Sequence, residues 1–523
     1  MIIEDVMSQV SRLYPQQLAL KSVHSGEEWT YQQLIQSYKQ LSVALSNAGL
    51  VKGDRAVIVS ENTPGHIIFI LACARIGVVA TPINSLLSTA QMVEVINDSE
   101  APILFYSDTF SGILQHESEL KNTKQFIKID KDDRGFFDSF ISLHVSAVAD
   151  IERKEHAVVE EDILYQMYTS GTTGKSKGAM ISHRNVLAEL TGLSYALHVA
   201  PKDKVLIATP YFHGAAVMMS ILALAHGGSC LIADTMTSSE LIGHLYHEQV
   251  AYCFVVPGMI INMVKEPTIK QADFSALKAL IYGAAPIPQY IQYEAIRYFG
   301  QKLVQIYGQT ETVMAMTLLY AKEHEPLMTH KHSRRIQSVG RQIFGCEVRV
   351  FDENDNDVAP GDVGEVVARG KNIMPGYHHL PEATANTLRD GWLRTGDLAT
   401  VDEDGYIYLR GRMKDLIICD GENVYPIQVE AVIDKIPGVV ESAVIGVPHS
   451  VDGEQVKAVV VIEPGATVSE DDIVRHCKAN MGAFQCPTSV DIVSSFPRNT
   501  GGKILKSELR QLYWQENLST IEA

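Results

Sequence analysis

Apolar runs of strand length alternate with helical patterns through the first half of the chain. In chain order they are a strand-like run at 54–60, a helical pattern at 64–76, a strand-like run at 77–83, a helical pattern near 90–99, and strand-like runs at 103–106, 204–209, 229–234, 251–257 and 279–283. Alternation of strands and helices predicts an α/β architecture with largely parallel strands. We therefore expect a large, layered N-terminal α/β domain.

The two longest apolar runs stop short of membrane-spanning length. They occupy residues 66–74 and 215–225 and are closed by Arg75 and His226. A helix that crosses a bilayer needs about 20 apolar residues in a row. The runs therefore predict buried helices, and we expect no transmembrane segment.

The pattern changes at about Gly345. Short β-rich pieces separated by glycine and acidic turns continue to Arg412, and a compact region follows, with helices near 427–435 and 468–480 and strands near 439–446 and 455–463. The sequence therefore predicts an N-terminal domain at 1–412, with a β-rich subdomain at about 345–412, and a small C-terminal α+β domain at 413–523.

Composition narrows the class of protein. A chain of 523 residues with 46% hydrophobic and 20% charged residues is typical of a globular enzyme with more than one core. The net charge of −18 argues against nucleic acid as a partner, because polyanion binding needs a clustered basic surface. An acidic amino-terminal segment and seven cysteines without a C-x-x-C pair predict a cytoplasmic protein with reduced thiols.

The segment YTSGTTGKSKG at 168–178 is the strongest chemical signal in the chain. Its glycines allow backbone amides to approach anionic oxygens, and its hydroxyls and lysines add donors and charge. The alternative interpretation of this segment is a surface loop without a ligand. The segment lies, however, between an apolar run ending at Tyr168 and a helical pattern near Ser182, and this position predicts a phosphate-binding strand-to-helix turn. A Walker loop is disfavoured because Thr169 stands where that motif requires glycine. The candidate phosphate-binding residues are Thr169, Ser170, Gly171, Thr172, Thr173, Gly174 and Lys177.

Further motifs in a fixed order give the chain a resemblance to a known family. They are YGQTE at 307–311, SVGR at 338–341, WLRTGD at 392–397, GRMKDLI at 411–417, GENVYP at 421–426 and PRNTGGKI at 497–504. With the phosphate loop, they make the chain resemble, over nearly its whole length, an acyl-CoA synthetase of the adenylate-forming superfamily. This superfamily also contains luciferases and the adenylation domains of peptide synthetases.

The resemblance implies ATP, Mg²⁺ and CoA as ligands and assigns roles to residues. Thr172 and Glu311 would hold Mg²⁺. The ring of Tyr307 would stack on adenine, and Gly308 and Thr310 of the same motif would also contact the nucleotide. Gly283, Ala284 and Ala285 would border the base and the acyl group, while Asp397 and Arg412 would hold the ribose hydroxyls. A core tyrosine and a surface ion pair are the competing interpretations of Tyr307 and of the Asp397–Arg412 pair.

The resemblance also implies a mobile C-terminal domain that rotates between two half-reactions. Lys503, in the glycine-rich turn TGGKI, would bridge the attacking carboxylate and the phosphate in the first. Lys414 would be the hinge, and Gly421 would let a pantetheine arm pass in the second. Asp420 departs from the family pattern, which has glycine there.

The acid substrate is predicted from PYFHGAAVMM at 210–219, which resembles the segment that lines the acyl pocket. His213 stands where relatives that activate amino acids tend to have an aspartate, and we group it with Lys503, Glu311 and Thr172 as a candidate catalytic residue. A buried ammonium group without a counter-charge is costly, so amino acids are disfavoured. We predict a medium- or long-chain fatty acid, with an aryl or branched acid as the alternative.

Three other questions stay open in the sequence. The acceptor thiol is CoA by default, but a carrier-protein phosphopantetheine would use the same route. A non-catalytic nucleotide sensor is the alternative class, and a homodimer is one open quaternary state. Two histidine pairs, His378–His379 and His244–His247, have no third metal ligand at a suitable spacing and are interpreted as packed or solvated side chains.

Overall fold

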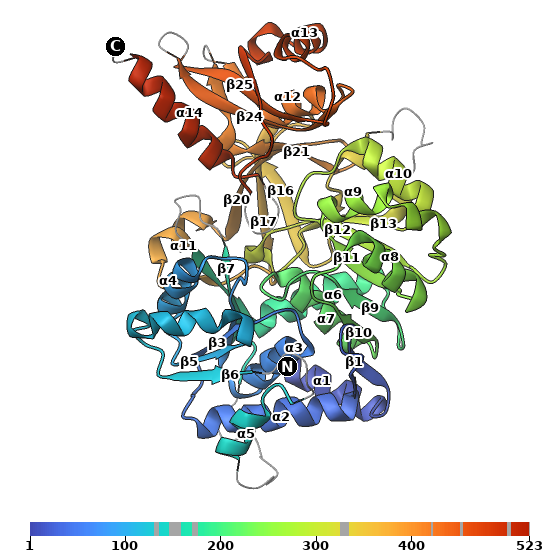
Figure 1. Ribbon diagram of the computed structural model, residues 1–523, viewed down its shortest axis with the longest axis vertical. Coiled ribbons are helices and arrows are strands. Elements are labelled where there is room, and N and C mark those ends of the chain that lie inside the picture. Colours follow the sequence, from blue (N-terminus) through green and yellow to red (C-terminus); the bar gives the residue numbers. More distant parts are fainter. Residues whose placement is uncertain are drawn as a thin grey trace. The chain divides into compact units, whose positions relative to one another are not determined.

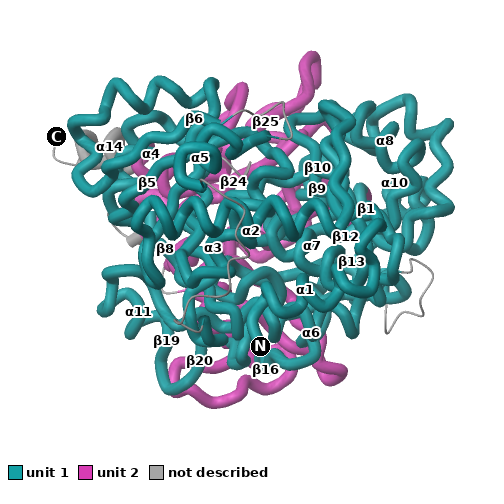
Figure 2. Tube along the Cα trace, turned by 90° about the horizontal axis from the view of Figure 1, so that it is seen from below, with its two compact units in different colours: residues 1–286, 291–348, 368–393 teal, residues 287–290, 349–367, 394–523 magenta. Residues whose placement is uncertain are grey.

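The computed structural model describes residues 1–129, 135–145, 158–169, 176–324, 334–419, 422–449, 453–498 and 504–521. The chain divides into two compact units (Figure 2). Unit 1 contains residues 1–286, 291–348 and 368–393, and unit 2 contains residues 287–290, 349–367 and 394–523. The predicted domain boundary after Arg412 falls inside unit 2, because much of the β-rich region belongs to the same unit as the C-terminal residues. The division into a fixed N-terminal domain and a mobile C-terminal domain at Arg412 stays a prediction.

Unit 1 contains a sheet whose central strands are parallel, as the alternating pattern predicts (Figure 1). Parallel pairing joins β13 to β12, β12 to β11, β11 to β9, β9 to β10 and β10 to β1, whereas β15, β14 and β2 are antiparallel to their neighbours. In spatial order the strands are β15 (Arg341–Gln342), β14 (Thr317–Leu319), β13 (Leu303–Tyr307), β12 (Ala279–Gly283), β11 (Tyr252–Val255), β9 (Lys204–Ile207), β10 (Ser229–Ile232), β1 (Leu18–Ser22) and β2 (Glu28–Thr30).

A second sheet in unit 1 carries the predicted phosphate loop. Strands β7, β4, β3, β5 and β6 pair in parallel, and β8 and β18 add antiparallel strands at one edge. In spatial order the strands are β18 (Gly376–Tyr377), β8 (Lys177–Ser182), β7 (Ile163–Thr169), β4 (Val79–Pro82), β3 (Arg55–Val59), β5 (Ile103–Tyr106) and β6 (Gln125–Lys128).

Three helices lie between these two sheets. Helix α3 (Pro64–Ile76) contacts β1 of the first sheet and β4 and β7 of the second, α7 (Gly214–Ala225) contacts β9, β10 and β11, and α6 (His183–Leu197) contacts β8 and α7. A helix that is apolar on all sides is buried on all sides, and the long apolar runs fall in α3 and α7 as predicted. Pro64 at the first turn and Gly77, with φ 73°, fix the two ends of α3.

The other helices of unit 1 complete its outer layers. They are α1 (Ile3–Leu13), α2 (Tyr31–Asn47), α4 (Thr89–Ser99), α5 (Asp138–His144), α8 (Ser238–His247), α9 (Pro257–Lys265), α11 (Pro381–Thr387) and α10 (Gln289–Phe299), whose first two residues are assigned to unit 2. Short 3-10 turns add η1 (Asp108–Glu119), η2 (Pro267–Gln271), η3 (Thr310–Thr312), η4 (Ala321–His324) and η5 (Arg335–Gln337). Over the part of the chain that the structure describes, no helix combines the length and apolar character needed to cross a membrane.

The β-rich region forms a third sheet, and the C-terminal region forms a fourth. The third has the order β16 (Cys346–Phe351), β17 (Val363–Gly370), β20 (Trp392–Val401) and β19 (Leu388–Arg389), with β21 (Ile407–Arg412) also paired to β20. The fourth has the order β23 (Glu422–Val424), β22 (Ile417–Cys419), β25 (Gly453–Ile462) and β24 (Val439–His449), with β26 (Ser489–Ile492) on β25.

Alternating side chains of β24 give the C-terminal sheet two apolar faces. Val444 packs in a cluster with α12 (Pro426–Ile433) and α13 (Glu470–Asn480), while its neighbours Ala443 and Ile445 pack in a cluster with Leu509 of α14 (Lys506–Ile521). The turns η6 (Met413–Asp415) and η7 (Ala483–Gln485) complete this unit. The prediction of an α/β fold with a large N-terminal part and a small α+β C-terminal part is confirmed.

Candidate active site

The predicted phosphate loop joins two antiparallel strands rather than a strand and a helix. Strand β7 ends at Thr169 and β8 begins at Lys177, and these two residues are register partners. The prediction of a strand-to-helix turn is therefore wrong: KGAMIS, which follows the loop, forms β8, and α6 starts only at His183, behind an N-cap at Ser182. Ser170, Gly171, Thr172, Thr173 and Gly174 lie outside the described residues.

Glu311 lies in η3, directly after β13, and is held at both ends. Its Oε1 accepts a hydrogen bond from the Tyr377 hydroxyl at 2.6 Å, and its backbone carbonyl accepts one from the Met374 amide at 2.9 Å. The residue is only 9% exposed. A buried carboxylate fixed in this way is a preorganised oxygen ligand for a hard cation such as Mg²⁺.

Tyr377 connects Glu311 to the phosphate loop, although no sequence motif marks it as a functional residue. Strand β18 pairs with β8, which places the Tyr377 ring 5.0 Å from the Lys177 ammonium group. Burial, followed by the Glu311 charge, raises the pKa of the Tyr377 phenol above its ordinary range, so the hydroxyl stays a donor. Lys177, Tyr377 and Glu311 therefore form a connected set in unit 1.

We expect Tyr377→Phe to lower kcat/KM for pyrophosphate release about 10- to 150-fold, because a hydrogen bond to a charged group is worth about 1.5–3 kcal/mol and the Glu311 carboxylate loses its positioning donor. Tyr252→Phe is the matched control, since it also removes a buried tyrosine hydrogen bond, from the Tyr252 hydroxyl to the Leu197 carbonyl at 2.6 Å. The control should lose stability but keep kcat/KM. Equal kinetic losses in both variants would contradict a positioning role for Tyr377.

The backbone after Glu311 is strained. Val313 has φ 67° and ψ −63°, and the Met314 amide donates to the Thr312 carbonyl at 2.8 Å, which closes a γ-turn that β-branched residues rarely adopt. A Cβ on Gly214 would lie 2.5 Å from the Val313 carbonyl oxygen, and one on Gly308 would lie 2.1 Å from that of Met314. Strain of this kind concentrates at functional sites, and glycine is required at both contacts.

The candidate adenine segment lies beside the YGQTE motif. Gly283 ends β12 and pairs in register with Ile306 of β13, so residues 283–285 and 307–311 leave the same edge of the parallel sheet. Ligands of α/β folds bind at this carboxyl edge. Ala284 is exposed and has φ 70°, and Tyr307 is 8% exposed at the end of β13. The structure brings Gly283, Ala284, Ala285, Tyr307, Gly308, Thr310 and Glu311 together here.

His213 caps the start of α7 next to the candidate acyl segment. Its side chain is exposed to solvent, yet neighbouring protein atoms crowd it enough to lower its pKa to about 4, so the imidazole is neutral at physiological pH. Its ring lies 4.6 Å from that of Phe212. The candidate acyl segment therefore presents no charge at this position.

A second buried carboxylate, on Glu189 of α6, was also missed in the sequence. It is fully buried, accepts a hydrogen bond from the Ala315 amide at 2.8 Å, and accepts another from the Asn372 side-chain amide at 3.1 Å. Ala315 follows the strained γ-turn, so Glu189 ties α6 to the segment behind Glu311. Burial raises the pKa of Glu189 from 4.5 to about 8 despite these two donors.

Glu189 should make stability depend on pH. Because its folded pKa lies above its unfolded value, the folded chain binds the extra proton, and the stabilisation from Glu189 falls as pH rises from about 4.5 to about 8. We expect Glu189→Gln to gain stability relative to the parent chain over this window, measured as the difference in Tm at a series of pH values. A difference in Tm that stays constant across the series would contradict the raised pKa.

Unit 2 holds the candidate ribose pair. Asp397 of β20 and Arg412 of β21 are register partners, and the Arg412 Nε lies 3.0 Å from the Asp397 carboxylate. Asp397 is 7% exposed. Lys414 lies in η6, where Arg510 of α14 binds its carbonyl and the Asp415 carboxylate at 3.3 and 3.1 Å. Gly421 and Lys503 lie outside the described residues, and the roles of all these residues stay predictions.

Comparison with known proteins matches this arrangement to one family. The model of the AMP-binding enzyme family matches residues 7–378, and that of the AMP-binding enzyme C-terminal domain matches residues 428–503. A feruloyl-CoA synthase of Amycolatopsis is 33% identical, covering 96% of this chain and 97% of that protein. A long-chain-fatty-acid–CoA ligase of Salmonella typhimurium is 30% identical, covering 93% and 91%. The crystal structure of ATP-bound MatB from Rhodopseudomonas palustris superposes with a TM-score of 0.88 at 29% identity, covering 98% of this chain and 99% of MatB.

Proposed function

We propose a specific reaction for this chain, which belongs to the AMP-binding enzyme family of the adenylate-forming superfamily and is an AMP-forming acid–thiol ligase. The proposed reaction activates a medium- or long-chain fatty acid with ATP to an acyl-adenylate and releases pyrophosphate. The acyl group is then transferred to the thiol of CoA, and AMP leaves. The proposed location is the cytoplasm, in keeping with cysteines that are free thiols in the structure.

The observation that carries the proposal is the fixed carboxylate of Glu311. A carboxylate and a triphosphate repel each other, so the α-phosphate charge must be neutralised before attack. Mg²⁺ supplies that charge when it is bound, and the Glu311 carboxylate, with the Thr172 hydroxyl, would hold it. Two oxygen donors leave the remaining positions for water and phosphate, which is how proteins usually bind this ion.

The other residues of unit 1 bind and orient in this scheme. The phosphate-loop residues and Lys177 would bind the phosphates, and the segments at 283–285 and 307–311 would bind the base. Lys503 would place its ammonium group between the attacking carboxylate and the α-phosphate, and Asp397 and Arg412 would bind the ribose. The Lys414 hinge would then withdraw Lys503 and bring Gly421 to the thiol.

The uncharged character of the candidate acyl segment supports a fatty acid. Residues 210–219 contain no carboxylate, and His213 is neutral at physiological pH. Ala216 and Met218 of this segment are buried, and Val313 and Met314 are buried after Glu311. Burial of each further methylene of a substrate is worth about 0.8 kcal/mol, or about fourfold in kcat/KM.

An aromatic carboxylic acid is the second candidate. The relative at 33% identity is a feruloyl-CoA synthase, and a similar apolar lining would accept a ring. The acceptor has an alternative as well, since a fatty acid–acyl-carrier-protein ligase of Streptomyces coeruleorubidus is 31% identical over 94% of this chain.

The test is a substrate panel with the purified chain. Rates of AMP release would be measured for straight-chain acids of increasing length and for hydroxycinnamic and benzoic acids, each with CoA and with a holo carrier protein. The proposal predicts kcat/KM that rises about fourfold per methylene through the medium-chain range, with CoA as the acceptor. A maximum at an aromatic acid, or turnover with the carrier protein alone, would replace the proposed substrate or acceptor.

A further inference from the structure

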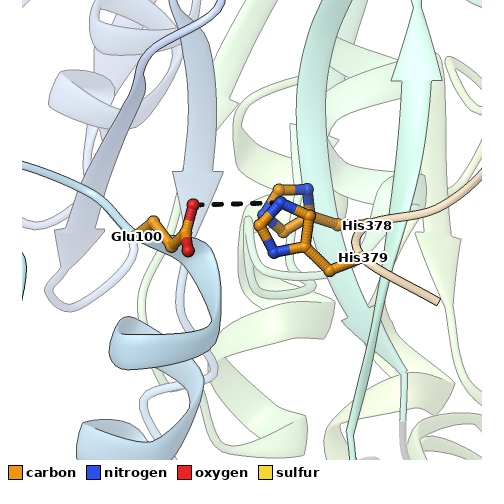
Figure 3. A group of neighbouring side chains, drawn as sticks. All are labelled: Glu100, His378 and His379. Carbon is orange, nitrogen blue, oxygen red and sulfur yellow. Dashed lines mark ion pairs between the residues drawn. The ribbon is translucent and has the colours of Figure 1, made fainter.

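A cluster of metal-ligating side chains lies outside the site described above. Ligand atoms of Glu100, His378 and His379 lie within 4.8 Å of one another (Figure 3). The two histidines have no third ligand near them in the sequence, but the fold brings Glu100 to them from the C-cap of α4. All three residues belong to unit 1.

The ligand atoms of the cluster lie close together, although farther apart than around a bound ion. The Glu100 carboxylate lies 3.8 Å from the His379 Nε2, and the two imidazole rings stack with centroids 3.7 Å apart. Ligands at about 2.0–2.1 Å from a tetrahedral Zn²⁺ are about 3.3 Å from one another, so the Glu100–His379 pair must close by about half an ångström, and no pair in the cluster by more than about 1.5 Å. Figure 3 shows the Glu100 carboxylate pointing toward the rings.

A second observation points to a ligand. His378 is 3% exposed, and its Nε2 has no hydrogen-bond partner among the described residues. A buried polar nitrogen without a partner is costly, and it calls for a bound group or a water. Glu100 and His379, by contrast, are more than half exposed, which leaves an open route for an ion from solvent.

Arg55 contacts His378 in a way that disfavours metal binding. Its Nη2 lies 2.8 Å from the His378 Nδ1, and a guanidinium only donates, so Nδ1 is the unprotonated nitrogen and Nε2 carries the proton. For Nε2 to bind a metal, this proton must move to Nδ1 and the Arg55 contact must break. Arg55 has other acceptors in reach, the Gly53 carbonyl at 3.0 Å and the Gln166 side chain at 3.5 Å.

We propose that Glu100, His378 and His379 form a binding site for a divalent transition metal ion, with Zn²⁺ as the expected ion. Two imidazoles and one carboxylate are a common protein ligand set for zinc, and an open fourth position takes water. The Arg55 contact weakens this site without removing it. The proposal does not depend on the proposed function, because it concerns residues with no assigned role in the reaction.

The site lies next to the reaction machinery. His378 directly follows Tyr377, whose hydroxyl holds Glu311, and the His378 amide donates to the Gly178 carbonyl of β8 at 2.8 Å. A metal at the cluster would therefore link the end of α4 to the segment that positions Tyr377. Zinc bound at this site would change how firmly Tyr377 is positioned, and through Tyr377 it would modulate the activity of the enzyme.

The test measures metal binding to the full chain after removal of metal with a chelator and without nucleotide, since ATP itself binds zinc. Titration with Co²⁺ is followed by visible absorption, and titration with Zn²⁺ by calorimetry. We expect one equivalent to bind with a tetrahedral cobalt spectrum. Glu100→Gln and His379→Gln should each weaken binding at least tenfold, and both positions are exposed, so the fold should persist, as thermal melting would check.

Two further variants sharpen the test. His247→Gln, in the histidine pair of α8, is the matched control and should leave binding unchanged. Arg55→Gln should tighten binding about tenfold, because the glutamine oxygen can accept the Nδ1 proton of a metal-bound His378, and such supporting hydrogen bonds change affinity 10–100-fold. The proposal would be overturned if the parent chain did not bind one equivalent of zinc. It would also be overturned if Glu100→Gln and His379→Gln bound zinc as tightly as the parent, or if Arg55→Gln did not change the affinity.

Discussion

Glu311→Gln is expected to slow pyrophosphate release by about a hundred- to a thousandfold. The glutamine keeps the size of the side chain and can still accept the hydrogen bond from Tyr377, so the fold around η3 should persist. What it loses is the negative charge that a hard cation requires, and loss of one preorganised electrostatic contact costs about 10²–10³ in rate. The measurement is single-turnover pyrophosphate release over a range of Mg²⁺ concentrations.

The control for this prediction is Glu323→Gln. Glu323 is another buried carboxylate of unit 1, 5% exposed, and it accepts a hydrogen bond from the Tyr320 amide at 2.8 Å. Its replacement should lower the Tm without a comparable loss of rate. If excess Mg²⁺ left Glu311→Gln at the parental rate and the parental Mg²⁺ dependence, a metal-binding role for Glu311 would be wrong.

Lys503→Ala is expected to separate the two half-reactions. Formation of the acyl-adenylate should fall about a hundredfold or more, because the ammonium group acts mainly in the transition state. Thioester formation from supplied acyl-adenylate should change little, because the proposed domain rotation removes Lys503 from the site before that step. Rapid-quench assays of each half-reaction give the two rates.

Lys478→Ala is the matched control, an exposed lysine of α13 in the same unit. It should leave both half-reactions at the parental rate. Equal losses in both half-reactions for Lys503→Ala would contradict a role confined to adenylation.

Much of the fold could be predicted from the sequence because its elements are strongly patterned. Helix α3 spans the predicted helical pattern at 64–76, and the strand-like runs at 103–106 and 279–283 match β5 and β12. These elements are buried on all sides, so local pattern and tertiary packing agree. The predicted α/β class followed from them.

Pairings between distant segments could not be predicted in this way. The sequence predicts the helical pattern near Ser182, where α6 begins, but not β8 between the loop and that helix, because KGAMIS is too short for its period to identify a strand. Tyr377 meets Glu311 only because β18 pairs with β8, and Glu100 meets the histidines only through the end of α4. Glu189 of α6 has partners far away in the sequence, Ala315 and Asn372, so its burial could not be predicted from the helix alone.

The most direct test of the central claim is to trap the mixed anhydride. The purified chain would be incubated with Mg²⁺, labelled ATP and a panel of carboxylic acids in the absence of CoA, and the products would be separated by chromatography. The account predicts an acyl-adenylate and one pyrophosphate per active site with a medium- or long-chain fatty acid, followed by conversion to thioester when CoA is added. Failure of every acid in the panel to give an adenylate, with protein that binds ATP, would contradict it.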